Sequence, residues 1–202
     1  MSVAGLNLDR AVAAFRAGKL VVFPTETLYA IGCDALDAAA LERLCRAKQR
    51  PAEKGIAVIL GDLAMLEQLT ASASEAVRVL GRAFWPGPLT ILVPAREELP
   101  SPIVRDGLVG CRVSSDPTAT RLARALGRPL AAPSANPADL APARDAAAAL
   151  AYFGDAVDVY LDDDVRDGAP STLVDPGPPL RVLRSGAVST EALEAALATR
   201  PA

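Results

Sequence analysis

An apolar run breaks abruptly into polar residues in the stretch Leu20-Val21-Val22-Phe23-Pro24-Thr25-Glu26-Thr27-Leu28-Tyr29. Residues 20–23 are too few and too β-branched for a helix, so they predict a buried strand. The polar residues behind them predict a loop at the end of that strand. Further along, the strand-like residues 130–132 open in the same way into Pro133-Ser134-Ala135-Asn136-Pro137. Open α/β sheets hold their ligands in loops of this kind at strand ends.

Between these two loops the chain carries a pair of cations, in Lys48-Gln49-Arg50-Pro51. Apolar residues at helical spacing predict a helix over 38–47 that delivers both cations at its carboxyl end. Pro51 stops this helix, because proline disfavours the α conformation in the residue before it. Two fixed positive charges beside hydroxyl and amide groups indicate an anion site, most simply for nucleotide phosphates. By themselves, Lys48 and Arg50 are more simply solvated cations at a helix end, where they favour the dipole.

The rest of the chain predicts helices and strands that mix without strict alternation. Helices are expected from Leu8 up to Gly18, through Phe84 from a capping box of Ser72 and Glu75, over 118–126 and 146–153, and from Thr190. Strands are expected over 56–60, 89–93, 108–113, 157–161, 171–174 and 180–183. Residues 162–164, 166–170 and 176–179 predict loops. This order predicts a mixed α/β sheet, and 202 residues suit one domain.

The composition excludes several classes of mechanism. Histidine is absent, so a Ser-His-Asp triad, a Cys-His pair and a His-ligated zinc site are all ruled out. The net charge of −3 does not predict nucleic-acid binding, although five cations gather within residues 43–54. The three cysteines lack CxxC spacing. No apolar run is long enough for a bilayer and no signal segment is visible, so we expect a cytoplasmic protein without a membrane partner.

These segments, in this order, resemble the YrdC-like family, the threonylcarbamoyl-AMP synthases. The resemblance extends from about Leu8 to Leu193. It rests on Pro24-Thr25-Glu26-Thr27, Lys48-x-Arg50, Trp85-Pro86-Gly87-Pro88-Leu89-Thr90, Arg112, Ser134-x-Asn136, Ser171-Thr172 and Leu183-Arg184-Ser185-Gly186. The family implies an α/β fold, a single twisted mixed-sheet domain with a large concave cavity. We expect it to span residues 1–202, without the further carboxyl-terminal domain that some relatives append.

The resemblance implies an L-threonylcarbamoyladenylate synthase, a nucleotidyltransferase that makes threonylcarbamoyl-AMP and pyrophosphate from L-threonine, bicarbonate and ATP. The product would pass to a downstream threonylcarbamoyltransferase complex that modifies the adenosine next to the anticodon in tRNA. ATP is a substrate, and Mg²⁺ would arrive with it and keep several waters, so no metal-binding residue is expected. Such a reaction needs positioning and charge neutralisation more than covalent catalysis, which suits a site with cations and no imidazole.

The resemblance also implies roles for individual residues. Lys48 and Arg50 would be the catalytic cations and would contact the phosphates of ATP. Arg112 would clamp the threonine carboxylate, and Thr25 and Ser134 would hold the polar groups of threonine and bicarbonate. Four further residues would line the ATP side: Asn136, Arg144, Ser171 and Arg184. The chain departs from the family pattern at Ala30, at Ser185 and over residues 137–140, and the last of these departures lies just before Arg144.

Other functions remain open at this point. A paralogue of the same fold could bind nucleotide or RNA, as a ribosome- or tRNA-associated factor, without synthase activity. Retention of both the Lys-x-Arg and the Ser-x-Asn motifs argues against such a degraded site. A carbamoyl-transferring relative is disfavoured, because no zinc-binding module is present. An RNA-binding protein with a basic concave face is a different class, and the acidic balance and few aromatic residues argue against it. Direct contact with tRNA stays an open alternative.

Overall fold

Within the residues described by the computed structural model, which are 4–5, 7–51 and 55–199, ten strands form one twisted sheet. Lys54, a member of the basic cluster, lies outside these residues. In spatial order the strands are β1 (Ala4–Gly5), β8 (Val159–Asp162), β2 (Val21–Pro24), β3 (Tyr29–Asp34), β7 (Leu130–Ala131), β4 (Val58–Leu60), β6 (Leu108–Val113), β5 (Leu89–Pro94), β9 (Thr172–Asp175) and β10 (Arg181–Arg184). Parallel pairs such as β4–β6 stand beside antiparallel pairs such as β5–β6. The predicted mixed α/β sheet in one domain is confirmed.

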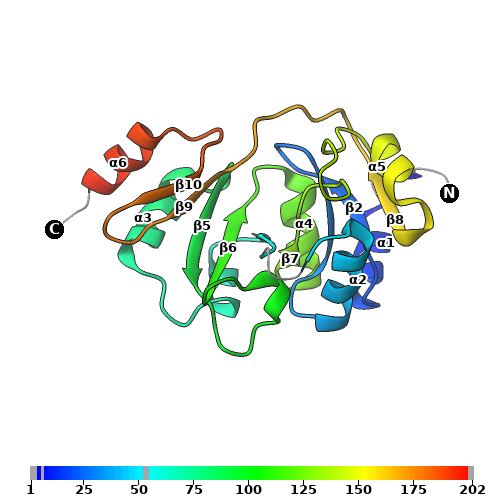
Figure 1. The fold of residues 1–202 in the computed structure, drawn as a ribbon, viewed down its shortest axis with the longest axis horizontal. Coiled ribbons are helices and arrows are strands. Elements are labelled where there is room, and N and C mark those ends of the chain that lie inside the picture. Colours follow the sequence, from blue (N-terminus) through cyan, green and yellow to red (C-terminus); the bar gives the residue numbers. More distant parts are fainter. Residues whose placement is uncertain (1–3, 6, 52–54, 200–202) are drawn as a thin grey trace.

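Two groups of helices cover the ends of this sheet (Figure 1). The α-helices are α1 (Leu8–Arg16), α2 (Ala38–Lys48), α3 (Glu75–Phe84), α4 (Pro117–Leu126), α5 (Ala146–Phe153) and α6 (Thr190–Ala198). Three short 3₁₀ helices are η2 (Ala64–Gln68), η3 (Ser101–Ile103) and η4 (Gly154–Ala156). Figure 1 shows α1, α2 and α5 around the half that holds β2 and β8, and α3 and α6 beside β9 and β10. No helix in the described part of the chain has the length and apolar character needed to cross a membrane.

Strands β5, β6 and β9 turn one face to the core and the other, of mixed polar and apolar residues, to a pocket, and this difference positions the site. Successive side chains of a strand point to opposite faces. On one face, seven apolar side chains are almost completely buried: Leu89, Ile91, Val93, Val109, Cys111, Val113 and Val174. The intervening residues, including Thr90, Leu92, Gly110, Arg112 and Leu173, line a pocket on the other face. Alternation therefore anchors these strands in the core and leaves their second face for a ligand.

Most predicted elements are present within one or two residues of their expected bounds, but the short strand β1 was not predicted, and neither was β3. Gly32 and Asp34 in its middle and at its end read as strand breakers in the sequence. The structure gives a reason for Gly32: a Cβ there would lie 2.8 Å from Cε1 of Phe23 and closer still to the carbonyl of Ala131. Gly32 therefore lowers the strand propensity of this segment, yet the packing of the strand requires a glycine at this position. Asp162, expected in a loop, is instead the last residue of β8.

The predicted capping box at the start of α3 is wrong. Ser74, not Ser72, is the N-cap, and its hydroxyl accepts a hydrogen bond of 3.3 Å from the backbone N–H of Val77. The helix therefore begins at Glu75, which the prediction had placed at the third helical position. Both serines lie a few residues before an apolar helical run, so spacing alone does not distinguish between them.

We expect Ser74→Ala to lower the free energy of unfolding by about 1 kcal/mol, because it removes the side-chain acceptor at the helix start. Ser72→Ala is the matched control and should change the free energy of unfolding by less than about 0.5 kcal/mol. Urea denaturation of the two variants beside the parent protein measures both values. Equal effects of the two substitutions would contradict the assignment of Ser74 as the cap.

Candidate functional site

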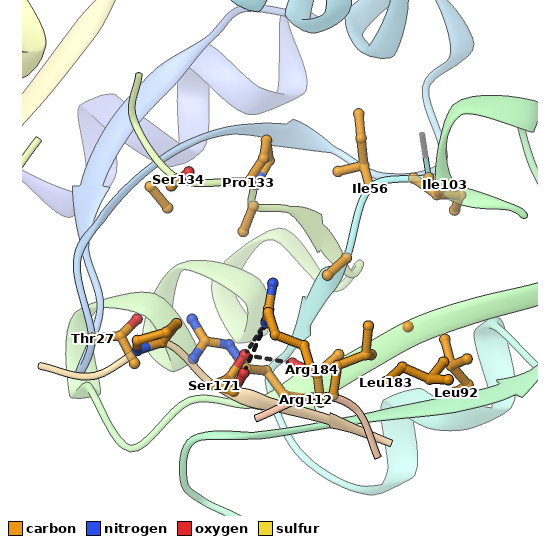
Figure 2. Close-up of a pocket in the computed structure, with 18 of the residues that line it drawn as sticks. Thr27, Ile56, Leu92, Ile103, Arg112, Pro133, Ser134, Ser171, Leu183 and Arg184 are labelled. Carbon is orange, nitrogen blue, oxygen red and sulfur yellow. Dashed lines mark hydrogen bonds between the residues drawn. The ribbon is translucent and has the colours of Figure 1, made fainter. Parts of the chain in front are cut away.

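A pocket of about 850 Å³ lies over the second, mixed face of β5, β6 and β9 and is also lined by residues of β10. Its remaining lining includes Thr25 and residues 27–30, residues 55–57 and residues 132–134. Figure 2 shows the two walls: Pro133, Ser134, Ile56 and Ile103 face Ser171, Arg184, Leu183 and Leu92 across the opening. The described lining residues include five arginines and one aspartate: Arg50, Arg105, Arg112, Arg181, Arg184 and Asp106. An acidic protein thus encloses a pocket with a positive lining, which favours an anionic ligand.

Thr25 organises the loop between β2 and β3. Its hydroxyl is almost fully buried, donates to the carbonyl of Leu28 at 2.6 Å and accepts from the N–H groups of Thr27 and Leu28, each at 3.3 Å. The hydroxyl of Thr27 lies 3.0 Å from it. Because the hydrogen of Thr25 is already used, Thr27 is the donor in this contact. Thr25 fixes the loop, and Thr27, which the sequence analysis did not select, presents its side chain to the pocket (Figure 2).

Arg112 is fixed by a buried carboxylate. One nitrogen of its guanidinium, Nη1, donates to Oε1 of Glu26 at 2.5 Å, and the other oxygen of Glu26 accepts from the hydroxyl of Ser114. The side chains of Arg112 and Glu26 are only 9% and 13% exposed. Burial lowers the pKa of Arg112, Glu26 opposes this effect and the nearby Arg184 adds to it. Glu26 holds the guanidinium in place while Arg112 still lines the pocket.

Arg184 and Ser171 form a second polar cluster on the same wall. The guanidinium of Arg184 donates to the carbonyl of Ser171 at 2.9 and 3.1 Å and to its hydroxyl at 2.9 Å. The Ser171 hydroxyl is also 2.9 Å from that of Thr90. A β-bulge places Arg184 opposite Leu173 where Val182 is opposite Val174, so Leu183 is the extra residue of β10. The bulge lets the successive residues Leu183 and Arg184 both line the pocket.

Lys48 lies behind the pocket wall rather than in it. Its side chain is 3% exposed, and its ammonium donates to the carbonyls of Ser134 and Asn136, each at 2.5 Å. Asn136 folds the same loop from the other side: its Oδ1 accepts from the Ser134 hydroxyl at 2.6 Å, and its Nδ2 donates to the carbonyl of Leu140 at 2.7 Å. Together these contacts present Ser134 to the pocket, which it lines. Lys48 and Asn136 themselves are absent from the described lining.

Gln49, a residue in the left-handed conformation, makes the side chains of Lys48 and Arg50 point to different places. Lys48 ends α2, and Gln49 caps the helix with φ of 51°. This conformation turns the chain, so that Arg50 lines the pocket while Lys48 lies beneath the loop of Ser134. Arg50 donates from Nη2 to the carbonyl of Gly55 at 2.7 Å, and burial lowers its pKa.

The structure therefore brings together six of the nine predicted site residues: Thr25, Arg50, Arg112, Ser134, Ser171 and Arg184. Lys48 and Asn136 act on that group through the loop. Arg144 is exposed and does not line the pocket, and its carbonyl accepts from the N–H of Arg166 at 2.8 Å. Sequence reasoning did not assign roles to Glu26, Thr27, Thr90 and Arg166. For Glu26, Thr27 and Thr90 a signal existed, since all three lie inside the quoted motifs.

The family model described as "Telomere recombination", that of Sua5, YciO and YrdC, matches residues 13–186. The chain belongs to the Sua5/YciO/YrdC family. A relative named threonylcarbamoyl-AMP synthase, from Chromohalobacter salexigens, is 42% identical over a match that covers 82% of this chain and 90% of that protein. The resemblance to the YrdC-like family stated from the sequence is confirmed.

Solved structures of the family share the fold. Sua5 from Pyrococcus abyssi, solved in complex with L-threonine, has a TM-score of 0.89 and 31% identity, and the match covers 98% of this chain. The chain spans 59% of the length of that Sua5 chain. YciO from E. coli has a TM-score of 0.81 and 27% identity, and the match covers 92% of both chains.

Burial, followed by the charge of Arg50, lowers the pKa of Lys48 to about 8. We expect its side chain to titrate near pH 8 in an NMR titration, with Lys48→Gln used to assign the signal. In the unfolded chain lysine titrates near pH 10.4, so the unfolded state binds more protons between these values. The contribution of Lys48 to stability is therefore lowest below pH 8 and rises as the pH increases towards about 10. A midpoint above pH 10 would show that the two carbonyl bonds outweigh burial.

Proposed function

We propose that this protein is an L-threonylcarbamoyladenylate synthase that acts in the cytoplasm. The observation that carries the proposal is the pocket lining: Arg112, fixed by Glu26, stands on the same wall as Arg184 and Ser171, and Arg50 faces the same space. Such a lining suits two substrates that carry anionic groups and bind side by side, the carboxylate of an amino acid and the phosphates of a nucleotide. The Sua5 relative solved with L-threonine and the relatives named as synthases support this assignment.

The carboxylate of L-threonine would bind Arg112. A guanidinium held by Glu26 on one side keeps a fixed direction, and the planar fork of arginine matches a carboxylate. The hydroxyl of Thr27 and that of Ser134 lie in the same pocket and would orient the polar groups of threonine and of bicarbonate. Thr25 would act indirectly, because its hydroxyl is engaged within its own loop.

ATP would occupy the remainder of the pocket with its phosphates near Arg50, Arg184 and Ser171. Asn136 and Lys48 would contribute through the loop that they fold, and Lys48 also adds positive charge behind Ser134. Mg²⁺ would enter with ATP as part of the substrate. The described lining residues include a single carboxylate, that of Asp106, so the chain offers the triphosphate mainly cations and hydroxyls.

The chemistry then needs no covalent enzyme intermediate. The amine of threonine and bicarbonate condense to an N-carboxylate and release water. An oxygen of this N-carboxylate attacks the α-phosphorus of ATP, the bond to the β-phosphate oxygen breaks and pyrophosphate leaves. Negative charge develops on the phosphoryl oxygens during the attack, and preoriented arginines stabilise it. The product would pass to a threonylcarbamoyltransferase complex that modifies the adenosine beside the anticodon in tRNA.

We expect the pure protein to form threonylcarbamoyl-AMP and pyrophosphate from ATP, Mg²⁺, ¹³C-bicarbonate and L-threonine, with the label in the adduct. Mass spectrometry detects the adduct, and omission of any one substrate should abolish it. Arg50→Ala should lower kcat/KM by about 100- to 1,000-fold, since it removes one preoriented donor to the developing charge.

Arg82→Ala is the control for this assay. Arg82 forms an exposed ion pair with Glu75 on α3, outside the pocket, and its loss should leave kcat/KM within about twofold. Binding of ATP without any adduct would overturn the synthase proposal and favour a nucleotide-binding relative. A salt-dependent complex with tRNA that forms without ATP or threonine would favour an RNA-binding function.

A further inference from the structure

Arg166 lies on the segment that crosses from β8 to β9, and its guanidinium contacts three parts of the chain. Nε donates to the carbonyl of Thr25 at 3.2 Å. Nη2 donates to Oδ2 of Asp116 at 3.1 Å and to Oδ2 of Asp163 at 2.7 Å. The side chain of Arg166 is 20% exposed and that of Asp116 only 4%. The proposed chemistry assigns no task to this residue, although its guanidinium bonds residues from three separate parts of the chain beside the pocket.

The bonds of Arg166 lead to Arg112 by a continuous path. Asp116, beyond its bond to Arg166, donates its backbone N–H to the hydroxyl of Ser114 at 3.1 Å. Ser114 donates that hydroxyl's hydrogen to Glu26, and Glu26 accepts from Arg112. Thr25, the direct neighbour of Glu26 in the chain, is bonded by Arg166 as well. Arg166 therefore reaches the buried ion pair from two directions, through the β2–β3 loop and through the loop after β6.

The segment that carries Arg166 is itself pressed against the β2–β3 loop. Cβ of any residue placed at Gly168 would lie 2.7 Å from the carbonyl oxygen of Glu26 and 3.1 Å from Cα of Thr27. The phenol of Tyr29 donates to the carbonyl of Asp163 and accepts from its N–H, both at 2.9 Å. These contacts leave the guanidinium of Arg166 little freedom to move relative to Thr25.

The positive charge of Arg166 also stabilises the buried carboxylate of Asp116. The carboxylate of Asp116 caps α4 by accepting a hydrogen bond from the N–H of Thr118 at 2.8 Å. This cap holds the carboxylate close to the loop after β6. Arg166 supplies the cation that this buried carboxylate pairs with. A buried carboxylate that loses its cation is strongly destabilised and moves towards water. Such a movement would shift the Ser114 hydroxyl away from Glu26.

We propose that Arg166 is a positioning residue for the amino-acid subsite. It fixes the loop of residues 25–27 and, through Asp116 and Ser114, the Glu26–Arg112 pair, so that Arg112 presents its guanidinium to the substrate carboxylate in one orientation. The assignment of that carboxylate to L-threonine rests on the proposed function. Arg166 acts through these neighbours and contacts neither substrate.

The test compares Arg166→Gln with Arg128→Gln. Arg128 pairs with Asp34, whose side chain is 7% exposed, so both substitutions remove a cation from a buried aspartate. Neither Arg128 nor Asp34 lines the pocket. Isothermal calorimetry with L-threonine and, separately, with ATP should give a threonine Kd about tenfold higher for Arg166→Gln, the size of effect that follows when residues that orient metal ligands are removed. The ATP Kd should stay within about twofold, and Arg128→Gln should change neither value.

Arg166→Lys provides a rescue and replaces Arg166→Gln if that variant does not fold. Its ammonium keeps one charge near Asp116 and Asp163 but cannot also span to Thr25, so an intermediate threonine Kd is expected. Equal threonine affinity of the parent and both Arg166 variants would overturn the proposal. A parallel fall in ATP and threonine affinity would also overturn it, because that pattern indicates a general loss of structure.

Hydrogen exchange separates this proposal from the proposed function, since it needs no substrate. The backbone N–H groups of residues 25–29 and 114–116 should exchange faster in Arg166→Gln than in the parent and should be unchanged in Arg128→Gln. If the parent protein binds no threonine, the function proposed above fails, yet faster exchange confined to these residues still supports the positioning role. Unchanged exchange in Arg166→Gln excludes that role whether or not threonine binds.

Discussion

A buried ion pair between Glu26 and Arg112 connects the two halves of this molecule at its pocket. Glu26 follows β2 in one half of the sheet, and Arg112 stands on β6 in the other. Removal of either partner would leave an uncompensated charge in a site that water scarcely reaches, at a cost of about 3–5 kcal/mol. The geometry of the pocket thus depends on keeping both charges of this pair together.

The pocket also shows how an acidic protein can hold anions. The net charge of the chain is −3, yet the lining is rich in arginine. Much of this charge is held in place by carbonyls or by acids that lie behind the wall, as with Arg184 on Ser171 and Arg112 on Glu26. Fixed donors of this kind need little reorganisation when a ligand arrives, which is why they stabilise developing charge better than mobile lysines. Lys48 illustrates the other use of a cation, since it serves as a buried support for a loop.

The sequence predicted the elements whose pattern is local. The β-branched run at residues 20–23 and the helix that ends at Lys48 follow from propensity and periodicity, and they place two of the polar loops correctly. The sequence could not predict which polar groups pair with each other, because Glu26 and its partner Arg112 are 86 residues apart in the chain. Lys48 was predicted to contact the phosphates from the family resemblance, and by itself it looked like a solvated cation at a helix end. Its burial results from the loop of residues 134–136, which comes much later in the chain. Gly32 caused the opposite error: its low strand propensity concealed β3, although close packing against Phe23 and Ala131 requires a glycine there.

The parallel pairing of β5 with β9 has a consequence for how the protein is made. Residues 89–91 pair with residues 172–174, so the whole of α4, β7, α5 and β8 is synthesised between the two strands. At ribosomal speeds of about 5–20 residues per second, the edge of β5 stays uncovered for several seconds. Such an edge offers unpaired backbone groups to any neighbouring nascent chain. Thr90, which later lines the pocket, is meanwhile on the open face of the same strand and is the only polar side chain among residues 89–94.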